Sequence, residues 1–258
     1  MEASRKSGTV IEFSHVSYRL NDIAARVIVS NANLTVARGE TLVLLGRSGS
    51  GKTTLLRLIN RMLSPTSGEV LVEGRATTQW DPIRLRRRTG YVIQDSGLFP
   101  HFSVAENVGL VPKLENWESK RIAARVNEML ALVGLDPAEY ARRRPRELSG
   151  GQRQRVGVAR ALAADPPILV MDEPFGALDP VTRAELQGEF RALAKRLNKT
   201  IVFVTHDLRE AILLASRIVL LQEGQIVATA SPEEFLNLDH PEVKAFANSL
   251  GESSRASA

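Results

Sequence analysis

The residues best suited to chemistry lie in one glycine-rich stretch, GRSGSGKTT, at positions 46–54. It fits the pattern G-x-x-x-x-G-K-[ST] in full, with the strand-like TLVLL before it and the helix-like LLRLINRM after it; this is the context that the motif requires. Glycines let the backbone wrap closely around phosphates, Lys52 would reach the β- and γ-phosphates, and Thr53 would place its hydroxyl on Mg²⁺. This phosphate loop predicts a nucleotide site made of Gly46, Arg47, Ser48, Gly49, Ser50, Gly51, Lys52, Thr53 and Thr54.

Two adjacent carboxylates follow the apolar run ILVM at residues 168–171. Such a run predicts a buried strand, and α/β sheets bind ligands at the edge where the carboxyl ends of their strands lie. Asp172 suits the Mg²⁺ shell, and Glu173 suits a base that orients the attacking water. An acidic strand end alone is a weak signal, but the phosphate loop upstream makes it strong.

Two further polar residues follow predicted buried strands: His206 comes after TIVFVT, and Gln94 comes after GYVI. A single histidine in this position is usually structural. Here its strand is expected beside ILVMD, so His206 would reach the γ-phosphate side, and the amide of Gln94 can bridge Mg²⁺ and water. The remaining histidines, His15, His101 and His240, lack the spacing of metal ligands, so we expect no metal site beyond nucleotide-bound Mg²⁺.

A second glycine-rich turn lies in ELSGGQRQRV at residues 147–156. Ser149, Gly150 and Gly151 form the turn, and a helical pattern follows it. Free backbone N–H groups and the helix dipole make such a turn favourable for an anion. No strand leads into it, however, and the phosphate loop already serves one nucleotide, so the turn alone does not identify its ligand.

Short β-branched runs alternate with helix-length patterns, which predicts an α/β sheet domain with helices on both sides. The expected strands lie near 10–14, 33–36, 41–45, 69–72, 91–93, 168–172, 201–205, 217–221 and 225–228. The expected helices lie near 51–62, 120–133, 151–164, 180–197, 207–214 and 231–237. The first third favours antiparallel strands, and the last third favours strand–helix units.

Residues 95–150 break this alternation because they contain no convincing strand. One apolar stripe at helical spacing predicts an amphipathic helix made of Ile122, Val126, Met129, Leu130 and Val133. We therefore expect a single domain with a helical insertion. The expected parts are a sheet lobe at about 9–94 and 155–248, an insertion at about 95–154, and frayed tails at 1–8 and 250–258.

Composition is that of an ordinary soluble globular protein, with 24% charged and 43% hydrophobic residues among 258. Its apolar runs are only strand-length, the N-terminus lacks the apolar core of a signal peptide, and there are no cysteines. The net charge of +5 includes the basic runs at 84–88 and 141–146. The basic runs are compatible with a solvated face or with binding to nucleic acid or an anionic membrane. Because no aromatics are interleaved with them, we favour the solvated face and expect no nucleic-acid partner.

The motifs together resemble the ATP-binding subunits of ABC transporters, from about residue 10 to 240. The phosphate loop resembles their Walker A, Gln94 their Q-loop, and ILVMDE their Walker B. LSGGQ, which ends at Gln152, resembles their signature sequence, so we call residues 149–152 the signature turn. Asp179 in GALD resembles their D-loop and His206 their switch histidine. The resemblance implies a P-loop NTPase sheet domain with an antiparallel β part and a helical subdomain inserted between Q-loop and signature.

One position departs from the family pattern. Members usually stack adenine on an aromatic residue at the end of an early strand, but in HVSYRL that place is taken by Leu20. Tyr18 would face the same side of a strand and could substitute for it. Tyr18 is equally suited to the core, so both interpretations stay open.

The resemblance also implies partners. Two such domains pair head to tail, so that Ser149 and Gly151 of one copy bind the γ-phosphate of the ATP held by the other's phosphate loop. The family docks on membrane permease subunits near the Q-loop, which here means residues 95–108, at the cytoplasmic face of the plasma membrane. Phe99, Pro100 and Phe102 would serve either that interface or internal packing.

The stretches INRMLSPTSGEV, GYVIQDSGLFPHFSVAENV and EPFGALDPVTRAELQ look most like importers of glycine betaine, choline and related quaternary amines, which also use a substrate-binding protein. Members of that group often carry C-terminal CBS domains, which we expect to be absent here or located elsewhere. The alternatives are an exporter or lipid-trafficking ATPase and, less expected, a non-transport ABC ATPase. The ATPase does not touch the cargo, so its residues cannot identify it.

Overall fold

The computed structural model describes residues 8–21, 26–94, 96–176 and 178–255. The chain divides into two compact units, one made of residues 1–85 and 200–258 and the other of residues 86–199. Each unit has its own strands and helices, and each carries part of the predicted site.

The first unit contains an antiparallel sheet with the strand order β2-β1-β4-β5. Its strands are β1 (Thr9–Arg19), β2 (Val27–Ala37), β4 (Ser67–Val72) and β5 (Arg75–Ala76). Buried and exposed side chains alternate along the second half of β2, as expected where one sheet face packs on a core and the other meets water. The antiparallel character expected of the first third is confirmed.

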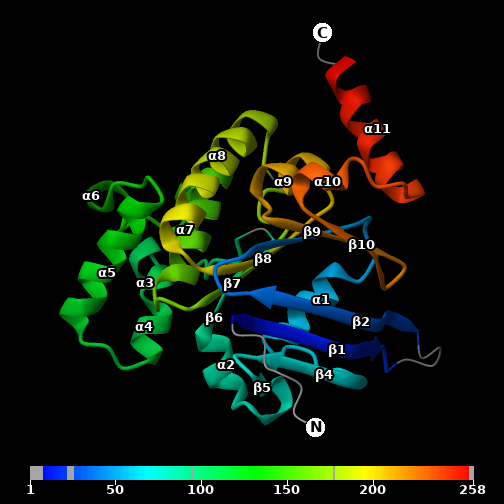
Figure 1. The fold of residues 1–258 in the computed structure, drawn as a ribbon. Coiled ribbons are helices and arrows are strands. Elements are labelled where there is room, and N and C mark those ends of the chain that lie inside the picture. Colours follow the sequence, from blue (N-terminus) through cyan, green and yellow to red (C-terminus); the bar gives the residue numbers. More distant parts are fainter. Residues whose placement is uncertain (1–7, 22–25, 95, 177, 256–258) are drawn as a thin grey trace. The chain divides into compact units, whose positions relative to one another are not determined.

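The same unit contains three parallel strands, in which β3 (Thr41–Leu45) lies between β8 (Thr200–Thr205) and β9 (Arg217–Gln222). The hairpin strand β10 (Gln225–Ala230) pairs antiparallel with β9. All six residues of β8 are buried. Two helices explain this burial: α1 (Lys52–Ile59) and α9 (Leu208–Leu214) lie on opposite faces of these strands (Figure 1).

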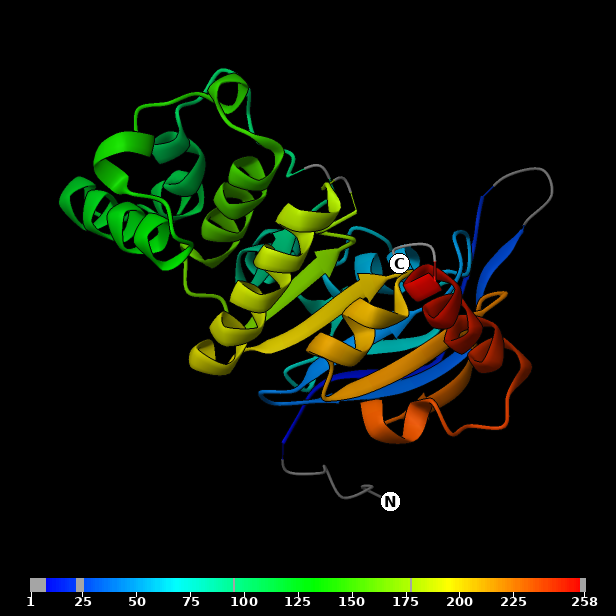
Figure 2. The same cartoon turned by 90° about the horizontal axis from the view of Figure 1, so that it is seen from above.

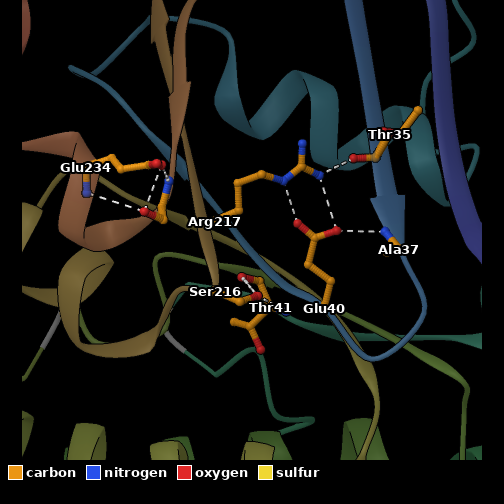
Figure 3. Close-up of polar contacts among 8 residues, drawn as sticks. Thr35, Ala37, Glu40, Thr41, Ser216, Arg217 and Glu234 are labelled. Atoms are coloured by element: carbon orange, nitrogen blue, oxygen red, sulfur yellow. Dashed lines mark hydrogen bonds and ion pairs between the residues drawn. The ribbon is translucent and has the colours of Figure 1, made fainter. Parts of the chain in front are cut away.

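Polar contacts fasten the amino ends of β3 and β9 to the end of β2 (Figure 3). The guanidinium of Arg217 donates to both carboxylate oxygens of Glu40, at 2.6 and 3.2 Å, and also to the carbonyl of Thr35. Glu40 additionally accepts from the backbone N–H of Ala37 at 2.7 Å. These contacts lie at the amino ends of the parallel strands, whereas the phosphate loop follows the carboxyl end of β3.

The remaining helical segments of this unit are η1 (Thr77–Gln79), α10 (Pro232–Phe235) and α11 (Pro241–Arg255), while α2 (Pro82–Arg88) runs across the unit boundary. Helix α11 continues to Arg255, into the range expected as a frayed tail from residue 250, and that tail stays a prediction. Buried Val243 anchors the start of this helix. The expected tail at residues 1–7 and the last three residues lie outside the described part.

The second unit pairs β6 (Thr89–Val92) with β7 (Ile168–Asp172) in parallel. Its helices α3 to α7 gather in one cluster (Figure 2). The helical segments of this unit are α3 (Val104–Val108), α4 (Leu110–Leu114), α5 (Ser119–Leu132), α6 (Pro137–Tyr140), η2 (Pro145–Glu147), α7 (Gly150–Leu162) and α8 (Pro180–Leu197).

The amphipathic stripe predicted around residue 126 is confirmed at four of its five positions: Val126, Met129, Leu130 and Val133 are buried along α5 and at its end, while Ile122 is half-buried. The described residues between β6 and β7 form helices and no strand. The boundaries of the helical insertion, at 95–154, stay a prediction. In the described part of the chain, no helix combines the length and the apolar character needed to cross a membrane.

Candidate functional site

The phosphate loop connects β3 to α1, as its motif requires. Gly51, the residue before α1 begins, has φ 100°, and a Cβ at this position would lie 2.8 Å from the carbonyl oxygen of Ile28. A Cβ on Gly46 would lie 2.4 Å from the carbonyl oxygen of Leu221. Both glycines are therefore needed where neighbouring backbone approaches the loop most closely.

Lys52, the first residue of α1, is only 4% exposed. Its Nζ donates to the carbonyls of Gly46 at 2.7 Å and Arg47 at 2.8 Å. A buried ammonium needs such acceptors, because burying it without them would cost several kcal/mol. The loop therefore holds its cation against its own backbone, at the place where the motif positions phosphates.

Strand register places His206 at the same edge as the phosphate loop. β3 and β8 pair so that Leu45 lies opposite Thr205. Leu45 is followed by the phosphate loop, and Thr205 is followed by His206. The hydroxyl of Thr205 donates to Glu210 Oε2 at 2.5 Å and accepts from the N–H of Asp207 at 3.0 Å. These bonds fix the backbone on both sides of His206, whose side chain is exposed.

Tyr18 is half-buried on β1, where it pairs with Val29 of β2. Leu20 lies just beyond the end of the strand. Neither the core interpretation nor adenine stacking is decided by this position, so the role of Tyr18 stays a prediction.

In the second unit, as in the first, predicted site residues follow the carboxyl ends of two paired parallel strands. Val92 lies opposite Met171 in the β6–β7 pair, so Gln94 and the two carboxylates follow at one edge. Asp172 is 8% exposed, and its Oδ2 accepts a hydrogen bond of 3.4 Å from the hydroxyl of Tyr91. Gln94 is exposed. The register thus places the amide and the carboxylate predicted as Mg²⁺ ligands just after the ends of two paired strands.

Glu173 has a left-handed backbone with φ 43°. This conformation is unfavourable for a residue with a Cβ and occurs often at functional sites. The carbonyl of Glu173 accepts from the N–H of Gly176 at 3.1 Å, which closes a tight turn after β7.

The signature turn is a complete helix N-cap. Ser149 Oγ accepts from the N–H of Gln152 at 3.2 Å, and Gln152 Oε1 accepts from the N–H of Ser149 at 2.9 Å. A Cβ on Gly151 would lie 2.6 Å from Cγ2 of Thr182, so this glycine allows α7 to approach α8. Ser149 and Gly151 therefore have structural roles, while the N–H groups of Gly150 and Gly151 have no partner within the helix ladder.

Asp179 is the N-cap of α8, where its Oδ1 accepts from the N–H of Thr182 at 3.0 Å. This backbone hydrogen bond is the main cause that lowers the pKa of Asp179 below the ordinary aspartate value. The carboxylate is therefore ionised at neutral pH, at the start of a helix whose dipole favours negative charge.

Two contacts that sequence reasoning missed organise the residues after Gln94. Buried Asn107 accepts from the N–H of Phe99 at 2.8 Å and donates to the carbonyls of Phe99, Phe102 and Ser103 at 3.0–3.3 Å. Phe99 is left 48% exposed, with its ring 5.3 Å from that of Phe102. Asparagine in a helical pattern gave no signal of this role.

The second missed contact comes from Arg160 on α7, which donates to the carbonyls of Ser96 and Gly97 at 2.8 Å each. Burial lowers the pKa of this arginine. The signature turn begins the helix that carries Arg160, so one helix links that turn to the residues just after Gln94.

Arg47 of the phosphate loop forms an ion pair with Glu242, the second residue of α11. The two residues are 195 positions apart, so no local pattern could have revealed the pair.

The described residues contain no group of three or more His, Cys, Asp or Glu side chains that could hold a metal ion. The donors predicted for Mg²⁺ are a hydroxyl (Thr53), an amide (Gln94) and a carboxylate (Asp172). Oxygen donors of this kind, few in number and completed by phosphates and water, fit Mg²⁺. Thr53 belongs to the first unit, and the other two belong to the second.

Comparison with known proteins gives consistent matches. The family model described as "ABC transporter" matches residues 29–176. The chain is 53% identical over 208 residues to the choline transport ATP-binding protein OpuBA of Bacillus subtilis (strain 168), covering 81% of this chain and 54% of that protein. It is 50% identical over 223 residues to the glycine betaine uptake system ATP-binding protein YehX of Escherichia coli (strain K12), covering 86% and 71%. The chain thus spans about half the length of OpuBA, and likewise of OpuCA and OsmV.

Solved structures agree with these matches. The ATP-binding cassette MJ0796, in a dimeric post-hydrolysis state bound to ADP and Pi, superposes with a TM-score of 0.76 at 32% identity, covering 86% of this chain and 98% of that one. The cbiO1 protein of Clostridium perfringens, part of the ABC transporter complex cbiONQ, gives a TM-score of 0.80 at 26% identity, covering 94% and 100%. The fold predicted from the sequence is confirmed.

Proposed function

Because the chain belongs to the ABC transporter family, we propose that it is the ATP-hydrolysing subunit of an importer of quaternary-amine osmoprotectants such as glycine betaine or choline. The observation that carries the substrate class is the identity of about half of its aligned residues to transport proteins named for choline and glycine betaine. The strand-to-helix phosphate loop with buried Lys52 supports the ATP site.

In this proposal, the loop N–H groups and Lys52 bind the β- and γ-phosphates of ATP, while Thr54 and the loop glycines complete the cradle. Glu173 accepts a proton from the attacking water and orients it, and His206 contacts the γ-phosphate side. Thr53, Gln94 and Asp172 would hold Mg²⁺, which neutralises phosphate charge when bound. The protein supplies position and charge, as phosphoryl transfer mainly requires.

The ATP site is completed by a second copy of the chain. The residues predicted around the phosphates on one copy are the phosphate loop, Gln94, the two carboxylates and His206. The signature turn of the other copy would add the N–H groups that its helix leaves unpaired, and Asp179 would lie at the same interface. The dimeric cassette bound to ADP and Pi supports this arrangement.

Permease subunits dock on residues 95–108, at the cytoplasmic face of the membrane. Asn107 and Arg160 hold this stretch in place, and exposed Phe99 offers an apolar contact of the kind that interfaces bury. A substrate-binding protein would deliver the cargo. No nucleic acid is required for this activity.

Co-expression of the chain with its permease and binding protein tests the proposal. We expect ATP hydrolysis in reconstituted vesicles to be stimulated by glycine betaine or choline together with the binding protein, and uptake of the labelled amine to depend on ATP. Stimulation by a lipid instead, or movement of cargo outward, would replace the substrate class with that of another ABC system.

A further inference from the structure

The ion pair between the phosphate loop and the C-terminal helix has two contacts. Arg47 Nε lies 2.5 Å from Glu242 Oε1, and Arg47 Nη2 lies 3.3 Å from Glu242 Oε2. The carboxylate side is shielded, at 12% exposure, whereas the Arg47 side chain is 70% exposed. The shielded partner is therefore the acid, and the arginine reaches out from the loop to meet it.

Glu242 belongs to a fixed part of its unit. The next residue, Val243, is fully buried, and the N–H of Glu242 donates to His240 Nδ1 at 3.2 Å. The N–H of Lys244 donates to the carbonyl of His240 at 3.0 Å. The start of α11 is thus tied down independently of Arg47, so its carboxylate stands at a set position beside the loop.

Arg47 is in turn connected to the residues that would bind phosphate. Its carbonyl accepts from Lys52 Nζ at 2.8 Å and from the N–H of Ser50 at 3.2 Å. A hollow of about 330 Å³ lies here, lined by Arg47, Ser48, Gly49, Ser50, Leu221, Gln222, Glu223 and Glu242. Ser50 Oγ, buried in this wall, has no hydrogen-bond partner among the described residues.

We propose that Glu242 is a positioning residue of the ATP site that neutralises Arg47 and thereby lowers the affinity of the phosphate loop for ATP. The proposal rests on the proposed function, because it concerns the ATP bound by that loop. A paired Arg47 adds little net charge beside the triphosphate. An unpaired Arg47 would attract the phosphates, and an unpaired Glu242 would repel them.

The charges therefore predict opposite effects for the two halves of one contact. Glu242→Gln leaves the arginine unpaired and should tighten ATP binding, whereas Arg47→Gln leaves the acid unpaired and should weaken it. Each shift should be roughly two- to eightfold at low ionic strength and smaller at physiological salt, where exposed charges are screened. A change confined to protein stability would not have this pattern of signs, and exposed ion pairs contribute little to stability.

The test measures the ATP dissociation constant of the purified full chain, by competition with a fluorescent ATP analogue, at two salt concentrations. The variants are Glu242→Gln, Arg47→Gln and the double substitution, for which we expect near wild-type affinity because both charges are gone. Asp239→Asn is the matched control: it breaks the exposed pair with Lys244 at the same helix start, 2.5 Å long, without touching the loop. Hydrolysis by the assembled transporter should show a changed KM and an unchanged kcat for Glu242→Gln.

Equal affinities for wild type and Glu242→Gln, or shifts of the same sign in both single variants, would overturn the inference. Lys52→Ala separates this failure from failure of the proposed function. If Lys52→Ala abolishes ATP binding while Glu242→Gln changes nothing, the ATP site stands and only the role of Glu242 is lost. If Lys52→Ala binds ATP as wild type does, the proposed ATP site itself is wrong.

Discussion

The substitution Ser149→Asp separates the two roles of the signature turn. The Ser149 hydroxyl caps α7 by accepting from Gln152 N–H, and an aspartate carboxylate caps a helix about as well as serine. The helix dipole also favours the added charge. We therefore expect Ser149→Asp to unfold within about 2 °C of the wild-type Tm. Exchanging one capping side chain for the other and adding the charge at the helix dipole each change the free energy of unfolding by about a few tenths of a kcal/mol.

The effect on ATP turnover should be much larger. In the proposed dimer, the aspartate would stand where the γ-phosphate of the partner's ATP must lie. Two unit charges 4 Å apart at an effective dielectric constant of 20 repel by about 4 kcal/mol, which corresponds to roughly a thousandfold loss of closed-state population. Ser149→Ala removes the cap without adding charge, costing about 1 kcal/mol and therefore about 2–4 °C in Tm.

Thermal unfolding and ATP hydrolysis by the assembled transporter are the two assays. Ser231, which caps α10 through the same reciprocal pair of hydrogen bonds, provides the control. Ser231→Ala should lower the Tm by a similar amount and leave turnover unchanged. Turnover of Ser149→Asp within twofold of wild type would refute the shared site and leave Ser149 as a helix cap only.

Two further predictions follow from single contacts. Asn107→Ala removes four hydrogen bonds to the turn at residues 99–103. It should lower the free energy of unfolding by about 2–3 kcal/mol and reduce recovery of the permease in co-purification. Undiminished recovery would show that this turn does not form the docking surface. Asp179→Ala should lower the Tm above about pH 5, where the carboxylate is ionised in both folded and unfolded states. Because folding lowers the pKa of Asp179, its stabilisation is lost as the pH falls through the folded value, so the Tm difference between wild type and variant should disappear in acid; a pH-independent difference would contradict the capping account.

The strands that carry the site could be predicted because their signals are local. ILVMD is apolar at every position but the last, and TIVFVT is apolar at its four central positions; burial on both sheet faces favours such continuous apolar runs. The phosphate loop was equally predictable, because its glycines stand in a fixed pattern. They are needed where the backbone of Ile28 and Leu221 leaves no room for a Cβ.

Contacts between distant segments were not predictable in this way. Glu242 reaches Arg47 only because β9, β10 and the helices after them return the chain to the phosphate loop. Asn107 has no sequence signature that distinguishes four backbone contacts from an ordinary helix surface position. Helix α11 was missed because its small polar residues look like a tail, although buried Val243 holds its first turn.

The central claim is that two copies of the chain close around ATP and that Glu173 is the base that ends this state by hydrolysis. The most direct measurement is the mass of Glu173→Gln in solution with ATP and Mg²⁺, by size-exclusion chromatography with light scattering. We predict a particle of twice the chain's mass that persists while ATP is uncleaved, and a monomer with ADP. An ATP-saturated variant that stays monomeric, together with an assembled transporter that stays open, would contradict the claim.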